Sequence, residues 1–202
     1  GIMLEGKRGY NTDYNWIYGN LIMAPDVDYG RGFAIQGGDG QVQYNKFYRN
    51  LIVNTTVRNQ IGGDHNYIYN NIIDGIRNVA HRTDGTAQGI SLEAYNTPYG
   101  TAVCHDNQFY NNTIMNTDEP GIAVWGYSGA GSKINNVFWN NLLYNTGRAS
   151  KDGRTNIGVY IMDHASVLAN TYQYNLIYNA TTTTTVSYRG SNQTVAAWDE
   201  AA

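Results

Sequence analysis

The sequence predicts an all-β solenoid built as a single domain. Three observations lead to this prediction: a motif with two asparagines that recurs six times, an alternating motif upstream of most of its copies, and a composition low in charge. The chain has 202 residues, of which 42% are apolar, 14% charged and 13% aromatic. A disordered chain would carry more charge, and a coiled coil would draw about half its residues from Ala, Glu, Lys, Leu and Arg.

The recurring motif begins with one asparagine and has a second asparagine five positions later. An apolar and a mostly aromatic residue lie between them, and two mostly aliphatic residues follow. The copies start 30, 21, 41, 29 and 34 residues apart, so the motif keeps its length while the connections vary. This is typical of a solenoid with loops between its repeats. The six pairs are Asn15 and Asn20, Asn45 and Asn50, Asn66 and Asn71, Asn107 and Asn112, Asn136 and Asn141, and Asn170 and Asn175.

The second motif alternates aliphatic or aromatic residues with more variable ones. This period of two predicts short strands with one buried face. The five copies are Gly1 to Glu5, Gly32 to Gln36, Gly89 to Glu93, Gly121 to Trp125 and Gly158 to Met162. The expected inward residues are Ile2, Leu4, Phe33, Ile35, Ile90, Leu92, Ile122, Val124, Val159 and Ile161, which leaves Glu5, Gln36, Glu93, Trp125 and Met162 as an outward column.

Each coil is therefore expected to hold about three short strands that pair with the coils above and below, ~4.8 Å away. Asparagine suits the bends for two reasons. It tolerates left-handed backbone angles, and its amide hydrogen-bonds to the equivalent amide one coil along. We therefore predict two asparagine ladders along the solenoid.

These two motifs resemble the repeat of right-handed parallel β-helices of the pectate-lyase-like superfamily. The resemblance covers about residues 1 to 190 and implies a fold of about six to seven coils. The tail, 191 to 202, includes a helical pattern from Thr194 to Glu200, which resembles the short helix after the last coils in many such proteins. The superfamily includes polysaccharide lyases, glycoside hydrolases, tailspikes and non-catalytic surface proteins, so the fold alone does not choose among functions.

The N-terminal end departs from that pattern, because the first coil begins at residue 1 without the amphipathic helix that usually caps such a core. We expect the chain to be a segment of a longer solenoid. The end of the stack would then be covered by missing flanking sequence or by a second copy, because exposed strand edges favour association.

Composition and spacing also exclude several partners. The net charge is -3, with no run of Lys or Arg, which argues against a nucleic-acid surface. No apolar run approaches the ~18 residues of a membrane span. The single Cys104 forms no internal disulfide, and no Cys and His spacing resembles a zinc site, so no metal is expected.

The candidate substrate-binding surface lies along the outward column. Trp125 and Tyr160 belong to its strands, and Tyr95 and Tyr127 follow just beyond two of them. Aromatic rings beside carboxylates form a surface on which sugar rings stack and hydrogen-bond. The alternative is that these tyrosines only favour strand formation.

Glu93 and Asp163 are the candidate acid and base of a glycoside hydrolase. Counted by asparagine motifs they lie two coils apart, about 10 Å along an axis with a ~4.8 Å repeat. This approaches the ~6.5 to 9.5 Å between the two carboxyl groups of inverting enzymes. His164 directly follows Asp163 and is a candidate titrating partner. The alternative is a pair of solvated carboxylates at the edge of the strands.

The long connection 74 to 88 carries Arg77, His81, Arg82 and Asp84 just before the Glu93 strand. Loops of this length are often functional. In a lyase, Arg77 or Arg82 would neutralise a uronate carboxylate while His81 removes the adjacent proton. The superfamily's lyases often use Ca²⁺ held by clustered acids, and the sequence has no such cluster. The alternative is a solvated insertion or a thin, irregular coil of its own.

Three further segments have simpler interpretations. The dipeptides Asp64-His65 and His105-Asp106 each precede an asparagine motif, where a turn needs small polar residues, so a turn role is favoured over metal binding. The basic connection 145 to 154 is expected to be a mobile surface loop, and the alternative is a contact with an anionic substrate.

Two functions of different class remain open. One is a glycoside hydrolase or polysaccharide lyase acting on an extracellular polysaccharide through the coils that carry Glu93, Trp125 and Asp163. The other is a non-catalytic β-helix, such as a glycan-binding surface module or a tailspike-like stem. Both place the protein outside the cell or in its envelope, with a polysaccharide or oligosaccharide as partner.

Overall fold

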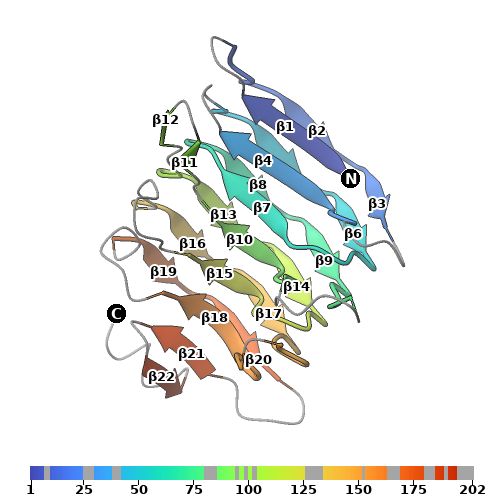
Figure 1. Cartoon of the computed structure of the whole chain (residues 1–202), viewed down its shortest axis with the longest axis vertical. Helices are drawn as coiled ribbons and strands as arrows, with labels where there is room; N and C mark the ends of the chain where they lie inside the picture. The colour runs from blue at the N-terminus through green and yellow to red at the C-terminus, as the bar shows by residue number, and fades with distance from the viewer. Residues whose placement is uncertain are drawn as a thin grey trace.

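The computed structural model describes residues 1–6, 10–24, 30–37, 42–79, 86–93, 96–97, 100–101, 104–125, 134–151, 153–162, 169–179, 185–188 and 191–194. Over these ranges the chain is a right-handed parallel β-helix without any α-helix. The coils stack along the long axis of the molecule (Figure 1), and each coil gives one short strand to each of three sheets. The predicted fold class is confirmed.

The first sheet has eight strands and the other two have six each. The first sheet consists of β1 (Ile2–Gly6), β4 (Phe33–Gly37), β7 (Asn59–Gly62), β10 (Ile90–Leu92), β15 (Ile122–Val124), β18 (Ile157–Ile161), β21 (Thr185–Tyr188) and β22 (Ser191–Thr194). The second consists of β2 (Trp16–Tyr18), β5 (Lys46–Tyr48), β8 (Tyr67–Tyr69), β13 (Gln108–Tyr110), β16 (Val137–Trp139) and β19 (Thr171–Gln173). The third consists of β3 (Leu21–Met23), β6 (Leu51–Val53), β9 (Ile72–Asp74), β14 (Thr113–Met115), β17 (Leu142–Tyr144) and β20 (Leu176–Tyr178).

Two antiparallel pairings complete the described structure. The short strands β11 (Asn96–Thr97) and β12 (Gly100–Thr101) form a separate two-stranded sheet. Strand β22 pairs antiparallel with β21 at the end of the first sheet. Thr194 is the last residue of β22, and the rest of the predicted tail helix lies outside the described residues.

The core is formed by inward columns that run through all three sheets. In the first sheet Ile2 pairs with Phe33, and Leu4 pairs with Ile35. The third sheet aligns one inward aliphatic residue per coil, from Ile22 through Ile73 to Ile177. All of the residues predicted to point inward belong to or pack against this one core. A single inward position per short strand is enough, because the stacked coils bury each other's apolar side chains.

Both predicted asparagine ladders are present. In each, the backbone N–H and the side-chain Nδ2 of one asparagine donate to Oδ1 of the asparagine in the next coil; for Asn45 and Asn66 both distances are 3.0 Å. Nδ2 of Asn71 also donates to the backbone oxygen of Phe47 at 2.9 Å. The central asparagines are fully buried, so these hydrogen bonds satisfy polar groups that water does not reach.

The left-handed backbone angles occur one position earlier than the sequence predicts. The ladder asparagines do not have positive φ; the residue before each one usually does, as at His65 with φ 53° and Asn70 with φ 55°. The bend is therefore divided between two residues. The first turns the chain, and the second hydrogen-bonds along the axis.

Strand β7 has no counterpart in the alternating motif of the sequence. Its first residue, Asn59, occupies the inward position that Ile90 holds in the next coil. The Asn59 side chain is fully buried, yet its Oδ1 accepts the Phe33 N–H at 3.0 Å and its Nδ2 donates to the Gly89 oxygen at 2.8 Å. The Asn59 amide therefore hydrogen-bonds to the backbone of both neighbouring coils. Because the inward residue is polar, a search for alternating apolar residues does not find this strand.

An aromatic column covers the outer face of the second sheet. We call it the tyrosine column, and it consists of Tyr18, Tyr48, Tyr69, Tyr110 and Trp139. The tyrosine rings stack nearly parallel at centroid distances of 5.1, 4.9 and 4.8 Å, and Trp139 follows at 5.7 Å with a tilt of 48°. Burial is the largest cause that raises the pKa of Tyr69 and of Tyr110, and neighbouring tyrosines raise it further.

Candidate functional site

The residues of the predicted outward column follow one another along the first sheet, with one further position, Gly62, between Gln36 and Glu93. Glu5 pairs with Gln36, and the next strand adds Gly62, which pairs with Gln36. The backbone N–H of Glu93 donates to the Ile61 oxygen, and that of Trp125 donates to the Leu92 oxygen. These hydrogen bonds place Glu93 and Trp125 in consecutive coils.

Glu93 is held in an ion pair that the sequence analysis missed. Nη2 of Arg58 lies 2.7 Å from Oε2 of Glu93, and Nε of Arg58 contacts Oε1. Ser91 donates its hydroxyl to Oε1 at 2.6 Å. The Glu93 side chain is only 3% exposed, against 17% for Arg58. Both carboxylate oxygens are therefore engaged by a bidentate arginine and a hydroxyl, which is a strong and strongly oriented arrangement.

The local sequence explains why Arg58 reaches this position. Asn59 pairs with Ile90, so Arg58 aligns with Gly89, one of the glycines that begin the alternating motif. Gly62 also matters here, because a Cβ atom at Gly62 would lie 2.7 Å from the Glu93 backbone oxygen. The sequence does contain a sign of this ion pair: Arg58 stands at the position where the alternating motif of other coils begins with glycine.

Trp125 is buried, whereas the sequence predicts an exposed aromatic face. Its side chain is 8% exposed. The Arg154 guanidinium lies 4.3 Å from the centre of the Trp125 ring and 4.7 Å from that of Tyr160. The two rings are 5.1 Å apart. Arg154 therefore makes a cation–π contact with two aromatic residues and covers the face that a sugar would have used.

Arg154 is in turn positioned by Glu119, a fully buried carboxylate that the sequence analysis also missed. Nη1 of Arg154 lies 3.9 Å from Oε2 of Glu119. The same carboxylate accepts hydrogen bonds from Ser150 at 2.7 Å, from the Lys151 backbone at 2.8 Å and from Asn78 at 3.0 Å. The connection 145 to 154, predicted to be a mobile loop, is thus anchored at several points by one buried anion.

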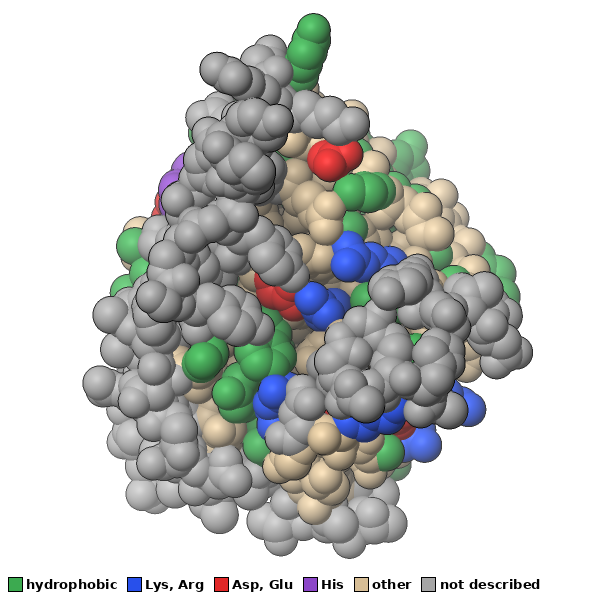
Figure 2. All heavy atoms as spheres, in the orientation of Figure 1, with side chains coloured by type: hydrophobic (Ala, Val, Ile, Leu, Met, Phe, Trp, Pro, Cys, Tyr) green, Lys and Arg blue, Asp and Glu red, His purple; other side chains and the backbone are tan. Residues whose placement is uncertain are grey.

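These residues lie on one side of the molecule and define what we call the charged face: Arg58, Ser91, Glu93, Trp125, Arg154 and Tyr160. Figure 2 shows acidic, basic and apolar side chains meeting in a hollow on the side of the molecule that carries the first sheet. The outward residues Ala34, Gln60 and Ser91 at the base of this face are buried. Of the six residues of the charged face, Arg58, Arg154 and Tyr160 are half-buried, whereas the other three are buried.

The remaining predicted site residues are placed only in part. Arg77 is exposed, and its backbone N–H donates to the Thr55 oxygen at 2.9 Å. The following predicted residues lie outside the described part of the chain: His81, Arg82, Asp84, Tyr95, Tyr127, Asp163 and His164. The proposed pair of Glu93 with Asp163 therefore stays a prediction.

The chain shows no significant similarity to any protein-family model, curated protein or solved structure with which it was compared. Within the described residues, no helix has the length and apolar character needed to cross a membrane.

Proposed function

We propose that the charged face binds an acidic polysaccharide and that the protein is a carbohydrate-binding β-helix of the pectate-lyase-like kind, working outside the cell or in its envelope. The observation that supports this proposal is the juxtaposition of Arg58 on Glu93 with Arg154 on Trp125 and Tyr160. A solenoid face is long and regular, with a repeat of ~4.8 Å along its axis. Such a face suits a linear polymer.

The chemistry of arginine determines the class of substrate that we propose. A guanidinium presents five donors in a planar fork that matches a carboxylate, and it also stacks on aromatic rings. Arg58 already pairs with Glu93 through Nε and Nη2. Arg154 has a side chain that is 15% exposed, so it is the arginine that we expect to meet a substrate carboxylate. Uronate groups carry the carboxylates that such donors recognise, whereas a neutral sugar gives an arginine no charge to neutralise.

Binding is favoured over hydrolysis by the surroundings of Glu93. Its two oxygens are occupied by Arg58 and Ser91, so neither is directed at a glycosidic oxygen. Hydrolysis by Glu93 with Asp163 remains an alternative prediction. Elimination involving Arg77 or Arg82 with His81 is the other.

Binding is tested by measuring affinity for a polyuronate, a sulfated glycan and two neutral glucans by calorimetry. We expect polyuronate binding that weakens with salt and falls about tenfold or more in Arg154→Gln, because a charge-assisted contact is lost. The matched control is Arg148→Gln, an exposed arginine on the same connection, which should keep wild-type affinity. Equal binding of the neutral glucans, or an equal loss in both variants, would contradict the proposal.

Catalysis is separated from binding in the same reactions. New reducing ends alone would indicate hydrolysis, and added absorbance from an unsaturated sugar would indicate elimination. We expect neither. If reducing ends do form, Glu93→Gln combined with Arg58→Gln tests the alternative without leaving one buried charge alone. Loss of activity in this folded double variant, with polysaccharide binding retained, would assign the Arg58 and Glu93 pair to the reaction.

A further inference from the structure

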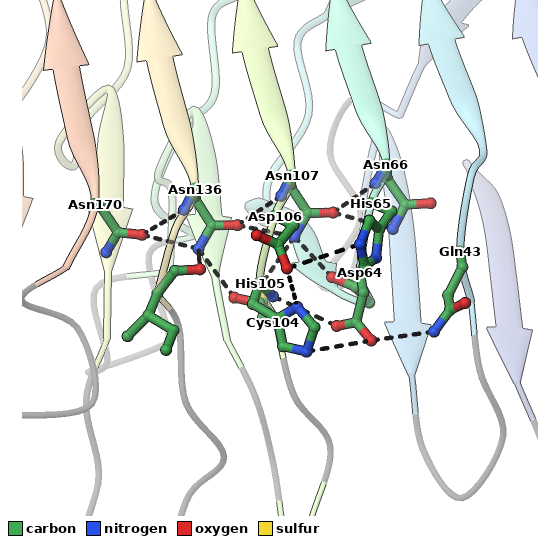
Figure 3. A network of polar contacts seen from close by, with 12 residues as sticks. Gln43, Asp64, His65, Asn66, Cys104, His105, Asp106, Asn107, Asn136 and Asn170 are labelled. Carbon is green, nitrogen blue, oxygen red and sulfur yellow. Dashed lines mark hydrogen bonds and ion pairs between the residues drawn. The ribbon is translucent and has the colours of Figure 1, made fainter.

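Two dipeptides that are far apart in sequence meet at the bend before the second sheet. Asp64-His65 precedes Asn66, and His105-Asp106 precedes Asn107. The backbone N–H and Nδ2 of Asn66 donate to Oδ1 of Asn107 at 2.9 and 3.1 Å, which places the dipeptides in consecutive coils (Figure 3). The turn role predicted for them is compatible with the backbone, since His65 and Asp106 have φ of 53° and 56°.

This stacking gathers two imidazoles and a carboxylate. Nδ1 of His105 lies 2.6 Å from Oδ2 of Asp106, and Nε2 of His65 lies 3.7 Å from the same oxygen. One donor atom from each of the three side chains lies within 4.8 Å of the others. The side chains of His65, His105 and Asp106 are 37%, 30% and 38% exposed, so an ion from solution has access to them.

The surrounding residues hold both rings in place. The His65 ring packs on Tyr44 at 5.1 Å and meets the edge of His105 at 5.7 Å. Nδ1 of His65 is buried without a hydrogen-bond partner within the described residues, so the ring directs its other nitrogen, Nε2, toward Asp106. These ring contacts favour an orientation of His65 in which Nε2 faces Asp106.

A second carboxylate, that of Asp64, lies near the His105 ring nitrogen that does not contact Asp106. Asp64 is 7% exposed and accepts a hydrogen bond from Gln43 at 3.3 Å. Its Oδ2 lies 3.8 Å from Nε2 of His105, and its Oδ1 accepts the His105 backbone N–H at 3.4 Å. A carboxylate on the far nitrogen of a histidine is a common way to orient a metal-binding ring.

We propose that His65, His105 and Asp106 bind a divalent transition-metal ion of the zinc type, with Asp64 as a positioning residue. Imidazole and carboxylate are the ligands that Zn²⁺ takes in proteins, at ~2.0 to 2.2 Å. At tetrahedral angles such bonds put the ligand atoms about 3.3 Å apart. The 2.6 Å contact of His105 with Asp106 must open and the 3.7 Å contact of His65 must shorten, both by side-chain rotation at an accessible surface.

The types of ligand atom also determine which metal ions the site prefers. Two nitrogen donors disfavour Ca²⁺ and Mg²⁺, which take oxygen ligands. A metal here joins two coils at one bend, so it stabilises the native stack over the unfolded chain. At about a hundredfold excess of Zn²⁺ over its Kd, we expect the Tm to rise by roughly 5 to 10 °C.

The test is calorimetric titration of the tag-free full chain with Zn²⁺, Co²⁺ and Ca²⁺, together with thermal unfolding. We expect one Zn²⁺ per chain, a Co²⁺ spectrum that reports nitrogen and oxygen ligands, and no comparable response to Ca²⁺. His105→Gln and Asp106→Asn should each weaken Zn²⁺ binding at least tenfold, and Asp64→Asn should weaken it by ~10- to 100-fold. Asparagine keeps the left-handed backbone at position 106 accessible.

The matched control is Asp13→Asn, because Asp13 lies two residues before a ladder asparagine, as Asp64 does, and no histidine lies beside it. Its affinity for Zn²⁺ should equal that of the wild type. The proposal is overturned if Zn²⁺ does not bind, if Ca²⁺ binds more tightly, or if a folded His105→Gln/Asp106→Asn double variant retains wild-type affinity.

Discussion

At the scale of single residues, the fold depends on amides that are buried and fully used. Asn71 illustrates this: it accepts two hydrogen bonds from Asn50 at 3.0 Å each and donates to Phe47 and Asn112 at 2.9 and 3.0 Å. No other side chain of similar size offers both a donor pair and an acceptor in this geometry. Sequence reasoning found these residues because the repeat fixes their spacing.

Replacing Asn71 with alanine should therefore lower the free energy of unfolding by about 3 to 5 kcal/mol, because each orphaned buried group costs ~1 to 3 kcal/mol. Asn20→Ala is the control. Asn20 is half-buried in the first coil, and its loss should cost only about 1 kcal/mol. Urea unfolding of both variants measures the difference. Equal losses would mean that burial does not determine the contribution of a ladder residue.

Two tyrosines of the tyrosine column make stability depend on alkaline pH. The pKa of Tyr69 and that of Tyr110 are raised in the folded chain, chiefly by burial. Their contribution to stability is present below the ordinary pKa of about 10 and is lost as the pH rises through the raised value.

We expect the free energy of unfolding to fall above about pH 10 and the fall to be smaller in Tyr69→Phe. Unfolding by urea at several alkaline pH values, with tyrosinate absorbance as a second measurement, checks this. Tyr174→Phe, which removes the hydroxyl of an 82% exposed tyrosine outside the column, should leave the wild-type slope. An unchanged slope in Tyr69→Phe would contradict the assignment.

At the scale of strands and connections, the sequence predicted the apolar strands but missed β7. An apolar period of two identifies a strand only where its inward positions are hydrophobic. Asn59 is inward and polar, and its hydrogen bonds to Phe33 and Gly89 compensate for this. Such a strand can be recognised only once the positions of the two neighbouring coils are known.

The connection 145 to 154 gives a prediction at the same scale. Glu119 accepts hydrogen bonds from Asn78, Ser150 and the Lys151 backbone, so Glu119→Gln places an amide donor among donors. We expect a loss of about 2 to 4 kcal/mol in unfolding free energy and faster tryptic cleavage within the connection. Asp118→Asn, which retains an acceptor for the Asn78 N–H, serves as the control. Cleavage at the wild-type rate in Glu119→Gln would show that other contacts hold the connection.

At the scale of the whole molecule, the repeat determines the coil but not the surface. Coils whose asparagine motifs start 21 to 41 residues apart contain equivalent strands, because only the strands and bends must match between neighbouring coils. The register of Glu93 and Trp125 was therefore predictable.

The burial of those two side chains was not predictable from the repeat. It depends on Arg58 and Arg154, which come from positions 35 and 29 residues away in the chain. Likewise, the meeting of His65 with His105 follows from the ladder register, yet each dipeptide alone resembles an ordinary turn. Side-chain contacts between coils do not recur at a fixed spacing in the sequence. The charged face and the histidine cluster of His65 and His105 are made of such contacts, so the sequence repeat does not predict them.

The tyrosine column has an optical consequence. Its rings are stacked closely, and the column ends at Trp139, 5.7 Å from Tyr110. Light absorbed by any of these phenols can pass along the stack and emerge as indole fluorescence, while the parallel rings couple in the near-ultraviolet circular dichroism. The protein thus carries an intrinsic reporter of whether neighbouring coils remain in register.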